Sequence, residues 1–121
     1  MLDNGCNALR VSVKKGKARS AQKSLQGTYC LSYNIHEENS WVAAAGKDAP
    51  ERAIWAYPEK KVWLIGRKVK IATATSGVYA RRKSGASPYG KGITWNYQSK
   101  GWKKDDLNDI KVKCVDKGPR R

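Results

Sequence analysis

The sequence predicts an all-β fold, a single small antiparallel barrel or sandwich of about eight short strands. Two observations support this prediction: short segments of alternating apolar and polar residues recur along the chain, and turn-forming residues separate them. A third is that no long stretch keeps the helical repeat of about 3.6 residues. At 121 residues and 13.5 kDa, the chain has the size of one domain with one core.

The first three strands are expected in the N-terminal third of the chain. ALRVSV, at residues 8–13, places its Leu and two Val residues on one face. In the segment that begins with GTY, alternation puts Tyr29, Leu31 and Tyr33 on one face. A third strand is expected near SWVAAAG, before the turn-prone KDAPE.

The middle of the chain carries the clearest supersecondary signal. In RAIWAYPEKKVWLIGR, at residues 52–67, two aromatic-rich segments flank PEKK, which predicts a β-hairpin with a polar tip. Further strands are expected at VKIATAT (69–75), GVYARR (77–82), GITWNYQ (92–98) and DIKVKCV (109–115).

The domain prediction is one β domain over residues 1–121, with its core at 8–115, a basic loop at 14–26 and a basic C-terminal tail at 116–121. No apolar run approaches the roughly 18 residues of a membrane span, and the first residues lack the apolar segment of a signal peptide. We therefore expect a soluble protein, or one peripheral to a membrane. The sequence assigns no compartment, and an intracellular or organellar location with a presequence removed ahead of Met1 stays open.

The chain has three cysteines, Cys6, Cys30 and Cys114, without a CxxC pair. They are too few and too scattered for a disulfide scaffold or a zinc site. We expect reduced thiols, with a bridge between Cys6 and Cys114 as the alternative. Cys114 alternates with apolar residues in DIKVKCV, so we expect it to point into the core.

Net charge is the strongest functional signal in the sequence. Twenty-five Lys and Arg against ten Asp and Glu give a formal charge of +15, well above the magnitude of about 2 to 8 that solubility asks for. This excess indicates a polyanionic partner. The basic residues expected to bind phosphates are those grouped in the connections and near the C-terminal end: Lys14, Lys15, Lys17, Arg19, Lys23, Arg81, Arg82, Lys83, Lys103 and Lys104.

Aromatic residues add two candidates for stacking on a ligand. Trp55, Trp63 and Trp95 lie within strand patterns and are expected in the core. Trp102, between Gly101 and two lysines, and Tyr89, in SPYGKG, are expected to be exposed and able to stack on a base or sugar.

Catalytic signals are weak, and we expect no enzyme. His36 adjoins two Glu residues, but sequence neighbours do not face each other in a strand, so a solvated loop position is favoured. The spacing of Asp105, Asp106 and Asp109 fits no EF-hand loop, which favours an anchoring or turn role over a metal site. The glycines form neither a GxGxxG nor a Walker A motif. We expect no cofactor and no metal.

One resemblance covers nearly the whole chain. The order GTY (27–29), Trp41, AIWAYPEKKVWLIG (53–66), GVYA (77–80), Pro88 and GITW (92–95) resembles a small β-rich repeat module of protist and algal proteins. The resemblance implies a compact binding or scaffolding β domain without catalytic residues. HEENS replaces the module's usual NG turn, and the basic loops are peculiar to this sequence.

The sequence thus predicts a non-enzymatic binding module or accessory subunit on an anionic surface of a large assembly, with the RNA of a ribonucleoprotein as the first partner. Two alternatives remain. One is a structural subunit of a membrane or photosynthetic complex, where the basic loops contact acidic protein or lipid surfaces. The other is a lectin-like module, for which the candidate residues are Trp95, Asn96, Tyr97 and Trp102.

Overall fold

The computed structural model describes residues 6–14, 26–32, 34–35, 39–43, 52–67, 70–73, 76, 78–81, 87–89, 93–98, 101–105 and 110–116. It confirms the all-β prediction, because the described elements are strands apart from one short 3₁₀ turn. The strands are β1 (Ala8–Val13), β2 (Gly27–Leu31), β3 (Trp41–Ala43), β4 (Arg52–Tyr57), β5 (Val62–Arg67), β6 (Val78–Arg81), β7 (Trp95–Gln98), β8 (Trp102–Lys104) and β9 (Ile110–Asp116). No helix in these ranges has the length and apolar character of a membrane span.

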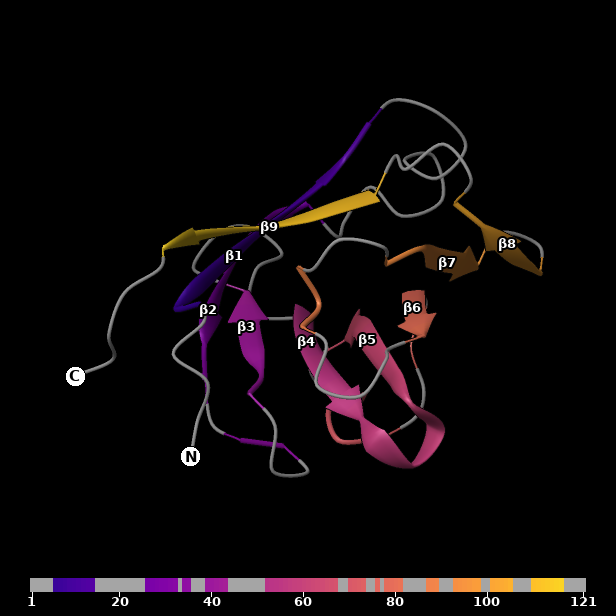
Figure 1. Cartoon of the computed structure of the whole chain (residues 1–121), viewed down its shortest axis with the longest axis horizontal. Coiled ribbons are helices and arrows are strands. Elements are labelled where there is room, and N and C mark those ends of the chain that lie inside the picture. Colours follow the sequence, from indigo (N-terminus) through magenta and orange to yellow (C-terminus); the bar gives the residue numbers. More distant parts are fainter. Residues whose placement is uncertain are drawn as a thin grey trace.

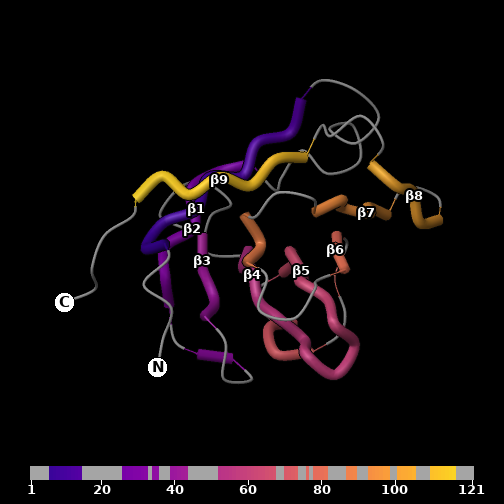
Figure 2. Tube along the Cα trace, in the orientation of Figure 1, coloured from indigo at the N-terminus to yellow at the C-terminus, as the bar shows by residue number. Residues whose placement is uncertain are grey.

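The nine strands form one antiparallel sheet in the order β8-β7-β6-β5-β4-β3-β2-β1-β9. The chain therefore follows a meander from β1 to β8, and β9 then returns to pair with β1. The sheet curls into a half-barrel, with β1 and β9 side by side across one side and the β4–β5 hairpin projecting from the opposite side (Figures 1 and 2). Curling lets a single sheet enclose a core on its concave face.

The concave inner face carries the main core. Alternate residues of the strands meet there, as the period-two patterns predicted. Trp41 belongs to this core, with its ring 6.0 Å from that of Trp63, and its indole N–H donates to the Cys6 carbonyl at 3.1 Å. The prediction that Trp55, Trp63 and Trp95 are core residues is confirmed, since their exposed fractions are 0%, 2% and 3%.

A second, smaller apolar cluster lies on the outer face of the sheet, around Trp55 and Leu64. Residues 70–73 pack against it, and the Trp55 indole N–H donates to the Thr73 carbonyl at 2.8 Å. The strand predicted at 69–75 is wrong for residues 70–73, the part of it that the structure describes. The Thr73 N–H and hydroxyl both donate to the Lys70 carbonyl, at 3.1 and 2.6 Å, so this segment turns back on itself and covers Trp55 instead of joining the sheet.

Two further features of the meander bear on the sequence predictions. The hairpin at 52–67 is confirmed, with full β4–β5 pairing and a 3₁₀ turn at Pro58–Lys60. The chain leaves that turn through Lys61, which has a left-handed φ of 55°. By contrast, Trp102 lies in a strand that the sequence did not predict: β8 pairs with β7 and forms one edge of the sheet.

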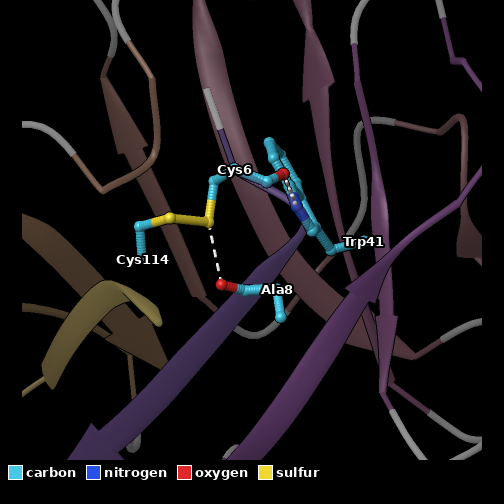
Figure 3. The surroundings of a disulfide bond; sticks show 4 residues. All are labelled: Cys6, Ala8, Trp41 and Cys114. Carbon is cyan, nitrogen blue, oxygen red and sulfur yellow. Dashed lines mark hydrogen bonds between the residues drawn. A yellow bond between two sulfur atoms is a disulfide. The ribbon is translucent and has the colours of Figure 1, made fainter. Parts of the chain in front are cut away.

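A disulfide joins Cys6, just before β1, to Cys114 on β9, with 5.8 Å between the Cα atoms (Figure 3). The prediction of reduced thiols is therefore wrong for this pair. Register explains why they meet: Leu9 is paired with Cys114, and a bulge between Ala8 and Leu9 shifts the ladder beside them. The Cys114 side chain packs against the core, as predicted, whereas Cys30 is an exposed free thiol.

Candidate functional site

Four of the ten basic residues that the sequence singled out lie in the described ranges, and all four are exposed: Lys14, Arg81, Lys103 and Lys104. The other six lie outside the described residues: Lys15, Lys17, Arg19, Lys23, Arg82 and Lys83. Lys103 and Lys104 do not act as a pair on one surface, because neighbours in a strand point to opposite faces. Lys104 is paired with Asn96, and Asn96 is paired with Tyr79. Lys104 therefore lies on the same outer face as Tyr79.

The structure brings together three further basic residues that the sequence interpretation missed. Arg10 on β1 is directly opposite Lys113 on β9, and Lys111 is opposite Ser12, one step along the same ladder. All three side chains are exposed on the outer face, because their neighbours Val11, Ile110 and Val112 are buried on the inner face. We call Arg10, Lys111 and Lys113 the basic ladder.

The basic ladder places like charges opposite each other on neighbouring strands. Side chains directly opposite each other in an antiparallel pair have Cβ atoms about 4.5 to 5.5 Å apart, and like charges at such positions destabilise the pairing. Lysines on edge strands commonly block unwanted strand addition, and this explains Lys111 and Lys113 on β9. It does not explain Arg10, because β1 lies between β9 and β2 and is not an edge strand. The fold alone therefore does not account for this cluster.

Trp102 is the most exposed large aromatic side chain in the described part of the chain, with half of its surface accessible. Its ring lies 4.8 Å from that of Tyr79, at an interplanar angle of 80°, which is an edge-to-face contact. Such a contact covers at most one face of the indole. Because Tyr79 is on β6 and Trp102 is on β8, the ring pair spans the outer face across β7.

Tyr89, the second predicted stacking residue, lies differently. It is half-buried and packs against the main core, with its ring 6.5 Å from Trp41 in an edge-to-face contact. Tyr89 therefore closes the core next to the buried Pro88 and offers a ligand less surface than Trp102 does.

The four lectin-like candidates do not share a surface. Trp95 and Tyr97 are buried in the inner core, whereas Asn96 and Trp102 belong to the outer face. Strand alternation separates them, since β7 sends Trp95 and Tyr97 inward and Asn96 outward.

Asp105 links β7, next to one edge of the half-barrel, to the first residue of β9, which forms the other edge. This buried residue follows β8; its N–H donates to the Trp95 carbonyl at 2.9 Å, and its carboxylate accepts the Ile110 N–H at 2.7 Å. The anchoring role predicted for this acidic group thus holds for Asp105, while Asp106 and Asp109 lie outside the described residues. As a result, the start of β9 lies next to the end of β8.

Within the described ranges, no three His, Cys, Asp or Glu side chains are grouped as a metal site requires. His36, the one histidine of the chain, lies outside those ranges, as do Glu37 and Glu38. The outer face of the described sheet thus presents cations together with the exposed Trp102, which packs on the partly buried Tyr79.

Comparison of the chain with protein-family models, with curated proteins and with solved structures finds no match. The resemblance to a repeat module of protist and algal proteins therefore stays a prediction, and the functional proposal rests on the chain's own residues.

Proposed function

We propose that this chain is a non-enzymatic β module that binds a polyanion, with RNA as the first partner, as an accessory subunit of a larger assembly. The binding surface is the outer face of the sheet. Its mechanism is electrostatic: exposed Lys and Arg side chains neutralise phosphates and release the counterions condensed on the nucleic acid.

The observation that carries the proposal is the basic ladder. Arg10 and Lys113 face each other across β1 and β9, an arrangement that costs folding energy unless an anion neutralises it. The net charge of +15 points in the same direction, because a compact state of this size is repelled by its own charge. Strands hold the backbone of these residues at fixed spacing, so less backbone freedom is lost on binding than from a flexible loop.

The test compares two double variants that lower the net charge equally. Lys111→Gln with Lys113→Gln removes two charges of the basic ladder, whereas Lys60→Gln with Lys61→Gln removes two exposed charges at the tip of the β4–β5 hairpin, on the opposite side of the half-barrel (Figure 1). Binding of a fluorescent single-stranded RNA is measured by anisotropy across a salt series.

For the intact chain, we expect the logarithm of the affinity to fall linearly with the logarithm of the salt concentration. Each lost phosphate contact lowers the slope by about 0.7 for single strands, so the ladder variant should lose roughly 1.4 in slope while the hairpin-tip variant keeps the slope of the intact chain. Equal effects of the two variants would show that only net charge matters. No RNA binding at low salt would refute RNA as the partner.

The disulfide favours a second candidate partner. Disulfides persist in oxidising compartments, where secreted proteins meet sulfated polysaccharides. The same titration with heparin in place of RNA tests this candidate: a tighter and equally salt-dependent interaction with heparin would assign the basic ladder to sulfates instead of phosphates.

A further inference from the structure

The Tyr79–Trp102 pair is an aromatic surface that the electrostatic mechanism does not use. Trp102 is half exposed although it belongs to a strand, and its ring contacts that of Tyr79 on the outer face of the sheet. An indole in that position exposes apolar surface to water, which the fold does not require of an edge strand that already carries two lysines.

Two basic side chains lie on the same outer face as this aromatic pair. Arg81 lies two residues from Tyr79 on β6 and so projects from the same outer face, where register also places Lys104. Gln98, directly opposite Trp102, and Asn96, directly opposite Lys104, add amide groups that can donate and accept hydrogen bonds. The surface therefore combines a ring, positive charge and amides, as in sites that stack a base and neutralise its phosphates.

The aromatic pair and the basic ladder are joined at the corner held by Asp105. Because the Asp105 carboxylate accepts the Ile110 N–H, the flanking residues Lys104 and Lys111 lie near each other. Standard bond lengths put their Cα atoms at most about 15 Å apart. A bound strand a few nucleotides long covers such a distance, so one strand can make both the base stacking and the phosphate contacts.

On this basis we propose that Trp102, supported by Tyr79, stacks on an unpaired base and makes the module selective for single-stranded nucleic acid. This inference rests on the polyanion binding proposed above. Selectivity follows from accessibility: the bases of a duplex stack on each other, whereas an unpaired base has a free face for the indole.

The test measures Trp102→Ala against the intact chain with a single-stranded RNA and with a duplex of the same length. Base stacking on an aromatic side chain predicts a loss of roughly 5- to 150-fold for the single strand. The duplex affinity and the salt slope should not change, because the indole carries no charge. Trp102→Phe keeps a smaller ring and should retain part of the lost affinity.

A matched control is Val115→Ala, which trims the other exposed large hydrophobic side chain in the described ranges. We expect this variant to bind single-stranded RNA as the intact chain does. Far-UV circular dichroism and a urea titration show whether each variant keeps its fold. If Trp102→Ala does not fold, the test uses Trp102→Phe and compares the quenching of tryptophan fluorescence by the bound single strand in this variant and in the intact chain.

The outcomes separate the two proposals. Salt-dependent RNA binding that Trp102→Ala leaves unchanged overturns the stacking site and retains the polyanion function. Equal losses for single strand and duplex, or an equal loss in Val115→Ala, also overturn it. Binding of a neutral oligosaccharide that depends on Trp102 and ignores salt overturns it in favour of a lectin-like site. Absence of RNA binding in the intact chain refutes RNA as the partner, and absence of heparin binding as well refutes the polyanion function itself.

Discussion

Removing the Cys6–Cys114 disulfide should cost this fold a large part of its stability. The bridge joins residues that are 108 positions apart, so it closes nearly the whole chain into a loop. In the chain-entropy model, a loop of that length restricts the unfolded state by about 4.8 kcal/mol at 25 °C. Domains of this size have a free energy of unfolding of only about 5 to 15 kcal/mol. The contribution of the disulfide is therefore a large fraction of the total stability.

The variant to measure is Cys6→Ala with Cys114→Ala, because alanine adds no hydroxyl at the buried Cys6 site. With urea m values of about 1 to 3 kcal/mol per molar, the unfolding midpoint should fall by roughly 1.6 to 4.8 M. Reduction of the intact chain should give a similar fall. Cys30→Ala is the matched control, since Cys30 is an exposed free thiol and its removal should leave the midpoint unchanged.

A thiol titration under denaturing conditions checks the premise. The oxidised chain should show one reactive thiol out of three, and the reduced chain should show all three. Three thiols in the untreated protein, or equal urea midpoints for the oxidised chain and the double variant, would refute this reasoning. In either case the β1–β9 hydrogen bonds alone would hold the two ends of the chain together.

Two further predictions concern the packing of the sheet. Gly66→Ala would put a Cβ atom 2.8 Å from the Ser76 Cβ and 3.2 Å from the Trp55 ring, so it should destabilise the fold by about 1 to 3 kcal/mol in a urea titration. The double variant with Ser76→Gly should regain part of that loss, and no recovery would contradict the clash. Burial raises the pKa of Tyr29 above its usual value, while Arg52 acts in the opposite direction. The folded state therefore keeps the phenol protonated where the unfolded chain begins to lose the proton, so stability should fall above about pH 10 by up to about 1.4 kcal/mol per pH unit. Tyr29→Phe should flatten this alkaline decline in urea midpoints, and identical declines in both proteins would rule it out.

The candidate site shows how far local patterns reach. DIKVKCV was predicted to be a strand with Cys114 facing inward, and by the same alternation Lys111 and Lys113 had to face outward. That signal was in the sequence, although the basic residues predicted to bind phosphates did not include these two lysines. The sequence does not contain the pairing of Arg10 with Lys113, because residues about a hundred positions apart are brought together only by the return of β9 to β1.

The sequence by itself determined the all-β class, the hairpin at 52–67 and the inward faces of most strands, because turn chemistry and period-two alternation are local properties. Tertiary structure decided the rest. VKIATAT alternates like a strand, but its described residues 70–73 form a turn, in which the Thr73 carbonyl accepts a hydrogen bond from the Trp55 indole. Trp102 joins the sheet because β7 offers it an open edge. Cys6 and Cys114 meet because strand order, which depends on contacts between distant residues, makes β1 and β9 neighbours.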